Sequence, residues 1–405
     1  MLSKTDSGGM GRPGRVLLVV EGASFSLTPE QEGLIAGTRR LAREELVPLA
    51  DAGQPGAVNR PLVRALGELG LLPRLFPERV GGARAGNVSA VELCLLREAL
   101  AIECTEAETA LALQGLGGYP IVQAGSEDLA SRYVPAVARG EAVAAFALTE
   151  PEHGSDAAAI ELRAERDGHD FRLSGVKAFI SNAPQADLYT MFARTTADAG
   201  ARGVTAFVVP GDAPGLTGEP LRLLVPHAIG RIELDGVRVP RDHVLGAIDE
   251  GFLVAMRTLD LFRPSVGAFA VGMARAALDA AVAHAAAREA FGRTISQFQA
   301  VSHTIAEMAT RTEAARLLVY AAAAAHDEGR PGVRRTSAMA KLFATESAQW
   351  VVDAAIQVHG AAALADDHLL AKLYREVRAP RIYEGTSEIQ REIIARELFR
   401  QSSGQ

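Results

Sequence analysis

The strongest constraint on the fold is an alanine-rich region that begins at Gly251. Within it, three long stretches contain few residues that interrupt helices: 252–289, 297–327 and 336–358. Uninterrupted stretches of this length predict long helices that pack as a bundle. We expect residues 249–405 to form a C-terminal helical bundle domain that also packs against other subunits.

The two preceding regions have different patterns. Residues 143–248 contain short runs rich in β-branched and aromatic residues, which predict a small antiparallel barrel or sandwich. These runs are VAAFAL, FRLSG, VKAFIS, LYTMFAR, VTAFVV and VRVP. Residues 26–142 are expected to be helical, and Thr28 with Gln31 forms a capping-box pattern at the first helix. Further helices are predicted near 60–70, 89–113 and 126–138. This order of helices, sheet and helices differs from the alternation of a doubly wound fold.

Residues 1–25 are expected to form a disordered leader. The stretch RVLLVVEGAS at 15–24 resembles a strand that enters a glycine turn. A dinucleotide-binding fingerprint needs three spaced glycines there, and this stretch contains Gly22 alone. The sequence therefore gives no support for a nicotinamide site of the Rossmann type.

Composition excludes several classes of protein. The 405-residue chain is 48% hydrophobic with a formal net charge of −7, which argues against binding nucleic acid by phosphate neutralisation. We find no run of about 18 apolar residues and expect no membrane span. Cys94 and Cys104 form no metal-ligand pattern, and we expect both to be buried apolar residues. Two free thiols are compatible with the cytoplasm, where we expect the protein to act.

One carboxylate near the C-terminus raises a functional question. In the sequence RIYEGTSEIQR, Ser387 with Gln390 forms a capping-box pattern, so a helix is predicted from about 387 to 399. Glu384 precedes this helix on a loop with Gly385, where the helix dipole favours an anion. Glu384 could be an electrostatic cap or a solvated acid, or it could be a base held on a turn that faces a cavity.

Several other motifs allow both a structural and a functional reading. The turn at 146–156, FALTEPEHGSD, could donate hydrogen bonds to a ligand or could be a plain β-turn. A rival interpretation is a metal site formed by Glu150, Glu152, His153 and Asp156, although no second acid or histidine cluster accompanies it.

The remaining motifs lie on a strand, a helix and a turn. Phe179 could stack on a flat heterocycle or pack in a core, and Asp260 with Arg263 could bind a ligand or form a surface ion pair. The turn within 288–299 could hold a pyrophosphate or be solvated, and His359 by itself fits a structural histidine.

In order and spacing, these motifs resemble the acyl-CoA dehydrogenase family of flavoproteins over residues 26–400. The resemblance rests on Thr149-Glu150-Pro151, Gly154-Ser155-Asp156, Gly175-Val176-Lys177-Ala178-Phe179-Ile180-Ser181, Arg288 with Phe291-Gly292, Gln357 with Gly360, and Tyr383-Glu384-Gly385-Thr386. It implies an α+β multidomain fold with an N-terminal helical domain, a middle β-barrel and a C-terminal four-helix bundle. It also implies bound FAD, a homotetramer, and an electron-transferring flavoprotein as the acceptor.

The resemblance assigns the chemistry to Glu384. This residue matches the family's base, which removes the α-proton of an acyl thioester while the β-hydrogen leaves as hydride to flavin N5, giving a trans-2-enoyl thioester. In the family, the backbone N–H of the base and a ribityl hydroxyl of FAD polarise the thioester carbonyl. Burial beside Tyr383 should raise the pKa of Glu384 towards working pH, whereas the helix end opposes this rise.

The resemblance also implies the binding residues, and it implies no metal. For FAD in the same chain these are Phe146, Leu148, Thr149, Gly154, Ser155, Phe179 and Ser181, with Thr386 and Glu388 at the pyrophosphate or adenosine end. For the FAD of a neighbouring subunit they are Arg288, Phe291, Gln299, Gln357 and Gly360. For the substrate they are Ser155, Asp260 and Arg263 near the CoA-bearing part, together with Tyr383 and Gly385.

The sequence departs from the family at several positions. Phe179 replaces a usual Trp and Phe146 a frequent Tyr, and both changes keep a ring. The Gly360–Ala363 turn contains fewer glycines than usual, which alters the expected contact between subunits. Residues 226–231 replace a segment rich in Ser and Thr, so an acyl group on a carrier protein is an alternative to acyl-CoA. Phe262 is apolar at the position where some members place the base, which leaves Glu384 for that role.

Two other functions compete with dehydrogenation. Flavin oxidases and flavin-dependent monooxygenases share the fold but generally lack a Glu at this place, and a non-enzymatic assembly protein would not need the base. For the substrate we expect a short, branched or cyclic acyl-CoA.

Overall fold

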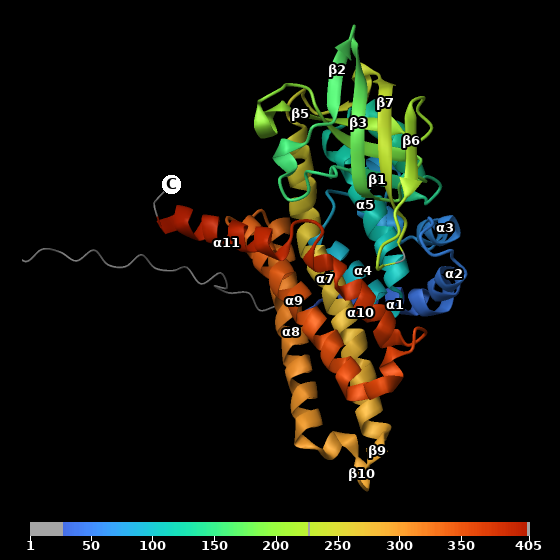
Figure 1. Cartoon of the computed structure of the whole chain (residues 1–405), viewed down its shortest axis with the longest axis vertical. Coiled ribbons are helices and arrows are strands. Elements are labelled where there is room, and N and C mark those ends of the chain that lie inside the picture. The colour runs from blue at the N-terminus through green and yellow to red at the C-terminus, as the bar shows by residue number, and fades with distance from the viewer. Residues whose placement is uncertain (1–26, 226, 403–405) are drawn as a thin grey trace, which may run out of the picture.

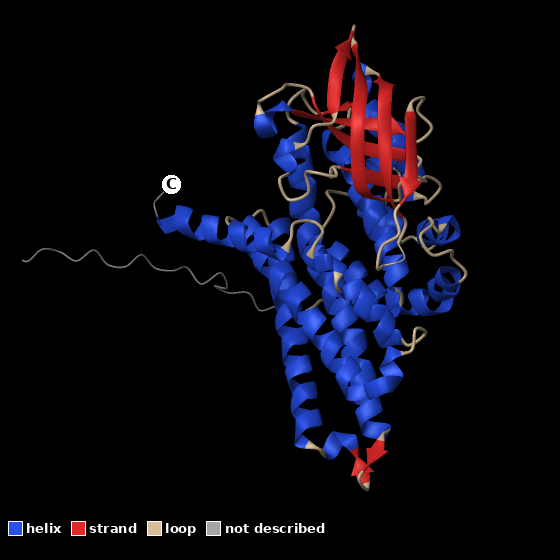
Figure 2. Cartoon of the chain, viewed as in Figure 1, coloured by secondary structure: helices blue, strands red, loops and turns tan. Residues whose placement is uncertain are grey.

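The longest helix, α7 (Gly251–Ala287), runs from beside the β-sheet towards the opposite end of the molecule (Figure 1). The computed structural model describes residues 27–225 and 227–402. The expected leader 1–25 and the strand-like stretch 15–24 lie outside these residues. Figure 2 shows the main sheet at one end of the molecule with helices below it, and the colours of Figure 1 show that these helices come from both before and after the sheet in the sequence.

The C-terminal helices form the bundle that the alanine-rich pattern predicts. Alongside α7 lie α8 (Gln299–Asp327), α9 (Val333–His359) and the shorter α10 (Leu369–Val377), and α11 (Ser387–Ser402) projects to one side (Figure 1). Small residues let these helices approach closely. A Cβ added at Gly267 would lie 2.6 Å from Val319 on α8, and one at Gly272 would lie 2.5 Å from Ala101.

Among the described residues, α7 is long and apolar enough to cross a membrane by length and composition, although we expected no membrane span from the sequence. About 72% of the most apolar 18-residue segment of α7 is buried inside the protein. Such burial is what a core helix of a bundle shows, because the other helices cover its apolar surface.

The N-terminal region is helical, as predicted. Its helices are α1 (Pro29–Leu41), which a π-helical turn (Ala42–Leu46) joins to α2 (Val47–Asp51), α3 (Arg60–Glu68), α4 (Ala90–Glu103), α5 (Thr105–Ala124) and α6 (Glu127–Ala138). The capping box of Thr28 and Gln31 is confirmed. The single helix expected over 89–113 is wrong, because extended backbone at Cys104 separates α4 from α5. Cys94 and Cys104 are free and buried, as expected.

The middle region is a sheet with strand order β6-β7-β3-β2-β4-β5-β8, in which β1 pairs with β4 in parallel. All the predicted runs are strands, and FRLSG and VKAFIS join into one long strand, β3. Three strands, β2, β6 and β8, were not predicted. The strands are β1 (Ala144–Ala147), β2 (Arg163–Asp167), β3 (Asp170–Ser181), β4 (Leu188–Arg194), β5 (Val204–Pro210), β6 (Leu216–Pro220), β7 (Ile229–Val239) and β8 (Val244–Leu245).

Register along the sheet follows its buried faces. β4 and β5 pair antiparallel from Leu188 opposite Pro210 to Arg194 opposite Val204, and nearly all their residues are buried. β3 pairs with β7 but shifts register between Lys177 and Ile180. This irregularity changes the direction in which Phe179 points, which matters for the site.

A small hairpin lies at the far end of the bundle from the sheet (Figure 1). It consists of β9 (Glu289–Ala290) and β10 (Arg293–Thr294) and joins α7 to α8.

Candidate active site

Glu384 lies on a turn whose backbone is held from two directions. Its φ is +51°, a left-handed conformation that is uncommon outside glycine, and Gly385 follows with φ +88°. Lys341 of α9 donates from Nζ to the carbonyl oxygens of Tyr383 and Gly385, at 3.1 and 2.6 Å. Gln390 of α11 donates to the carbonyl of Gly385 at 2.9 Å. The surrounding helices therefore fix this unusual turn.

The helix start next to this turn differs from the prediction. Thr386, and not Ser387, accepts the backbone N–H of Ile389 at 3.3 Å. Ser387 instead donates to Glu346 of α9 at 2.7 Å, and the Gln390 side chain turns back to the Glu384 turn. The side chains expected to form a capping box thus fasten the turn to the bundle.

The Glu384 carboxyl group is in an unusual environment. Its Oε2 atom is inaccessible to solvent and has no hydrogen-bond partner among the residues described. Burial raises the pKa of Glu384, and the nearby charges of Arg97, Lys341 and Arg263 oppose that rise. Glu384 as a whole is half-buried, and its one dry, unpaired oxygen favours a base on a turn over a solvated or capping acid, which would have water or N–H groups at both oxygens.

Lys341 and Arg97 were not anticipated as site residues. Lys341 is fully buried on a face of α9 formed otherwise by small residues such as Ala338, Ala340 and Ala344. Burial lowers the pKa of Lys341 to about 8, although the charge of Glu384 opposes this shift. A lysine within an alanine-rich, buried helix face is the signal in the sequence that could have revealed it.

The 146–156 turn and strand β3 are tied together. The backbone N–H of Ala178 donates to the Thr149 carbonyl at 3.1 Å, and Lys177 donates to the Leu148 carbonyl at 2.9 Å. Lys177 also forms a buried ion pair with Glu150 at 2.8 Å. These contacts place Thr149 beside Phe179, as expected for two parts of one binding site.

The rival metal site is wrong. The Glu150 carboxylate is taken up by Lys177 and by the backbone N–H groups of Glu161 and Leu162, at 2.6 and 2.9 Å. No group of three or more His, Cys, Asp or Glu residues suited to a metal is present in the part of the chain that the structure describes.

Phe179 presents its ring to solvent. It lies at the register shift of β3 with φ +56°, and 56% of its surface is exposed. The alternative of a core position is therefore wrong. Ser181 is half-buried at the end of the same strand, and Gly154 and Ser155 are exposed on the adjoining turn. Phe146 is half-buried with its ring 4.9 Å from that of Phe192, and Leu148 is buried.

Asp260 and Arg263 form an ion pair on α7 at 2.7 Å, and Arg334 of α9 also contacts Asp260 at 3.1 Å. Arg263 is buried, so a plain surface ion pair is the wrong interpretation. Its charge acts on Glu384, which places it on the base's side of the helix. Phe262 is buried as well, with its ring centroid 6.3 Å from that of Tyr119.

A second group of predicted residues lies elsewhere in the chain. Phe291 is 94% exposed on the β9–β10 hairpin, at the end of the bundle remote from the sheet (Figure 1). Arg288 and Gln299 are exposed on either side of it. Gln357 and Gly360 flank His359, whose ring stacks on His284 of α7 at 4.2 Å, so they belong to the same end. One chain does not bring these residues to Phe179.

Of the remaining predicted residues, Tyr383, Gly385 and Thr386 adjoin Glu384, and Glu388 is exposed at the start of α11. In the segment 226–231, His227 lies 2.7 Å from the buried Glu376 of α10, and the charge of Glu376 raises the pKa of His227 against the effect of burial.

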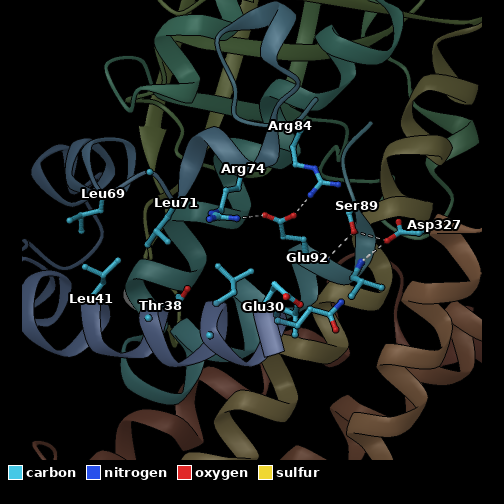
Figure 3. Close-up of a pocket in the computed structure, with 17 residues that line it drawn as sticks. Glu30, Thr38, Leu41, Leu69, Leu71, Arg74, Arg84, Ser89, Glu92 and Asp327 are labelled. Atoms are coloured by element: carbon cyan, nitrogen blue, oxygen red, sulfur yellow. Dashed lines mark hydrogen bonds and ion pairs between the residues drawn. The ribbon is translucent and has the colours of Figure 1, made fainter. Parts of the chain in front are cut away.

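A groove of about 870 Å³ lies apart from this site, between α1, α4 and the chain at 69–74. Figure 3 shows Glu92 at its centre between Arg74 and Arg84, and Asp327 beside Ser89. Five leucines are also among the residues that line it: Leu34, Leu41, Leu69, Leu71 and Leu95. None of the predicted site residues lines this groove.

Comparison with known proteins yields matches along nearly the whole chain. Three family models match: acyl-CoA dehydrogenase, N-terminal domain over residues 28–141, middle domain over 145–237, and C-terminal domain over 249–399. A curated relative, cyclohexane-1-carbonyl-CoA dehydrogenase of Geobacter metallireducens, is 36% identical over 381 residues, which cover 93% of this chain and 99% of the relative.

Two solved structures are similar over comparable lengths. Butyryl-CoA dehydrogenase from Megasphaera elsdenii superimposes with a TM-score of 0.88 and 32% identity, covering 93% of this chain and 100% of that one. An FAD complex of PigA superimposes with a TM-score of 0.88 and 29% identity, covering 94% of this chain and 100% of that one.

Proposed function

The chain belongs to the acyl-CoA dehydrogenase family, and on that premise we propose that Glu384 is the base of an FAD-dependent α,β-dehydrogenation of an acyl-CoA thioester. The observation that carries this proposal is the Glu384 carboxyl group. One of its oxygens is buried without a partner in the part of the chain that the structure describes, on a strained turn that Lys341 and Gln390 hold in place. Strain and an unsatisfied carboxylate are tolerated where they serve a reaction.

The environment of Glu384 suits proton abstraction. Burial raises its pKa, which strengthens it as a base, while the charges of Arg97, Lys341 and Arg263 favour the ionised form. Removal of the α-proton places negative charge on the thioester oxygen. The backbone N–H of Glu384, on the left-handed turn, is the donor that we expect to stabilise this charge.

The surface around Thr149 and Phe179 supports the proposal that the protein binds FAD. The exposed ring of Phe179 offers a stacking platform, and the hydrogen bond between Ala178 and Thr149 sets the exposed turn next to it. These residues fit FAD, with Phe146, Leu148, Gly154, Ser155 and Ser181 around them and Thr386 and Glu388 at the far end. When bound, FAD supplies the two-electron oxidant that takes the hydride from the β-carbon.

The assembly and the partners are also proposals. Phe291 and its neighbours are remote from Phe179 in one chain, and a homotetramer would let the hairpin of one subunit reach the flavin of another (Figure 1). An electron-transferring flavoprotein in the cytoplasm is the acceptor that the family resemblance suggests. For the acyl group we favour a short, branched or cyclic chain, since the curated relative acts on cyclohexane-1-carbonyl-CoA.

The proposal is tested by anaerobic titration of the purified protein with a panel of acyl-CoAs while the oxidised-flavin absorption is followed. Bleaching by one class confirms dehydrogenation. Glu384→Gln should retain FAD and reduce the flavin about 100- to 10,000-fold more slowly, because general-base catalysis is lost. Glu392→Gln, an exposed acid on α11, is the matched control and should react normally.

Three outcomes would contradict parts of the proposal. A normal rate of flavin reduction in Glu384→Gln would exclude it as the base. A yellow protein that no acyl-CoA bleaches would favour a carrier-protein thioester, an oxidase or a monooxygenase. A colourless protein that cannot be reconstituted with FAD would contradict an enzyme role.

A further inference from the structure

A buried ion pair joins α4 to α5 in the interior of the protein. Arg97 is 3% exposed and Glu108 is 0% exposed, and Arg97 donates from Nε to the Glu108 carboxylate. The Nη1 atom of Arg97 donates to Ser265 of α7 at 2.7 Å, and the guanidinium carbon lies 5.9 Å from the centre of the Phe269 ring. Two charges buried in this way usually stabilise a fold no better than apolar side chains of similar size, so packing alone does not account for them.

The pair lies close to the base. Among the cations that act on Glu384, Arg97 has the largest effect, ahead of Lys341 and Arg263. Glu108 has the largest electrostatic effect on Tyr383, the residue next to the base. Arg97 is linked to Ser265, two residues beyond Arg263 on α7. Geometry agrees with these electrostatic effects: a Cβ added at Gly267, two residues beyond Ser265, would lie 3.4 Å from Ala344 of α9, the helix whose Lys341 holds the Glu384 turn. The ion pair and that turn therefore lie against the same part of α7.

This pair has hydrogen-bonding capacity to spare. A guanidinium carries five N–H donors. Within residues 27–225 and 227–402, Nε and Nη1 of Arg97 have partners, whereas Nη2 forms no hydrogen bond and is not among the fully buried atoms that lack one. The second carboxylate oxygen of Glu108 accepts a long hydrogen bond of 3.3 Å from Thr109. Arg97 thus has a donor atom without a hydrogen bond, and Glu108 has an oxygen with only one long hydrogen bond, among the described residues.

We propose that the acyl chain of the substrate carries an uncharged oxygen substituent, a hydroxyl or a carbonyl, and that this oxygen binds to the Arg97–Glu108 pair. The inference rests on the proposed function, because the thioester of this substrate is the one placed at Glu384. Arg97 donates to the oxygen, and a hydroxyl also donates to Glu108. Burial raises the pKa of Glu108 to about 7, although the charge of Arg97 opposes the rise. Above that pH the pair carries no net charge, so a charged substituent gains from one partner what it loses to the other, and an uncharged oxygen is favoured.

The preference for an oxygenated acyl chain follows from the hydrogen-bonding groups that an unsubstituted chain would leave without a partner. A plain alkyl chain of the same length would cover Arg97 and Glu108 without offering them a hydrogen-bond partner. Sites built around a hydrogen bond to the substrate discriminate strongly against analogues that lack the group. For one substituent we expect kcat/KM to be about 10- to 100-fold higher than for the unsubstituted acyl-CoA.

The test compares acyl-CoAs of equal chain length with the FAD-loaded wild-type enzyme. Each length is supplied unsubstituted, hydroxylated, with a keto group and with a terminal carboxylate, and the substituent is moved outward from the γ-carbon. The rate of anaerobic flavin reduction is measured for each. The expected result is faster reduction by a hydroxy- or keto-acyl-CoA than by its unsubstituted counterpart.

The outcomes separate this inference from the proposed function. If unsubstituted acyl-CoAs of every length react as fast as the oxygenated ones, the inference is overturned while dehydrogenation stands. A preference for the carboxylate series overturns the assignment of an uncharged group. If no thioester bleaches the flavin, the proposed function fails and the inference fails with it.

Variants test the residues directly. The double variant Arg97→Met/Glu108→Leu replaces the pair by apolar side chains, a change that buried ion pairs often tolerate. It should lose the preference for oxygenated chains and gain activity on unsubstituted ones. Glu98→Gln is the control, since Glu98 contacts Arg316 and Tyr320 on α8 instead and should leave the preference unchanged. An unaltered preference in the double variant overturns the proposal, and if that variant does not fold the wild-type panel decides.

Discussion

Lys341 fixes the turn that carries Glu384: its ammonium group donates hydrogen bonds to the carbonyl oxygens of Tyr383 and Gly385, the two residues that flank Glu384 in the chain. Burial raises the pKa of the Glu384 carboxyl group, and the charge of Lys341, after that of Arg97, opposes this rise. One buried side chain of α9 thus controls both the geometry and the acidity of the base. This combination allows mutation to test position and charge together.

Lys341→Met should slow flavin reduction by roughly 10- to 100-fold, because the turn loses two hydrogen bonds and the base loses its alignment. The pH below which the rate of flavin reduction falls, which is set by protonation of Glu384, should become higher, since a cation that favours the carboxylate is removed. Stopped-flow reduction between pH 5 and 9 measures both effects.

Lys177→Met is the matched control for this experiment. Lys177 is equally buried, and its pKa is likewise lowered to about 8, but it pairs with Glu150 on the sheet. This variant should lose stability, without a change in the pH below which flavin reduction slows in the molecules that retain FAD. An unchanged value of that pH in Lys341→Met would contradict the proposed role of Lys341.

Activity should fall as the pH is lowered through a value above the ordinary range of a glutamate. The proposed base must be ionised to accept a proton, and burial raises its pKa from the usual 4.5. The rate therefore rises with pH and levels off above the pKa of folded Glu384. The pH dependence of kcat/KM for an acyl-CoA that bleaches the flavin measures this value, and a flat profile down to pH 5 would argue against it.

Phe179→Ala should weaken FAD binding by about 3- to 10-fold, the loss expected for one aromatic stacking contact. The ring is more than half exposed, so the melting temperature of the FAD-free protein should hardly change. Phe179→Trp restores the larger ring and should bind FAD at least as well as the native protein. Equal FAD affinity in all three proteins, measured by fluorescence titration, would remove Phe179 from the flavin site.

Phe291→Ala should also weaken FAD binding, although Phe291 lies at the far end of the bundle within its own chain (Figure 1). The reason is the proposed assembly, in which the hairpin contacts the flavin of a neighbouring subunit. Unfolding and reassembling Phe291→Ala together with Phe179→Ala should restore native affinity at some sites, because hybrid oligomers contain sites with both rings intact. Absence of restored sites would contradict a flavin site shared between subunits.

Much of the architecture could be predicted from local patterns. Alanine-rich stretches with few helix breakers predicted α7, α8 and α9, and the capping box of Thr28 correctly placed the start of α1. The short strands β2 and β6 were missed because they are largely exposed and lack an apolar alternation. The break at Cys104 was missed because no glycine or proline marks it.

The sequence by itself determined most of the helices, the long strands, and that Glu384 stands beside a glycine on a loop before a helix. These features depend on neighbours within a few residues, whose spacing and backbone preferences are visible in the chain. The tertiary structure decided what surrounds the Glu384 carboxyl group. Lys341, Arg97 and Glu108 come from three helices far away in sequence, and their burial and hydrogen bonds exist only once those helices pack together.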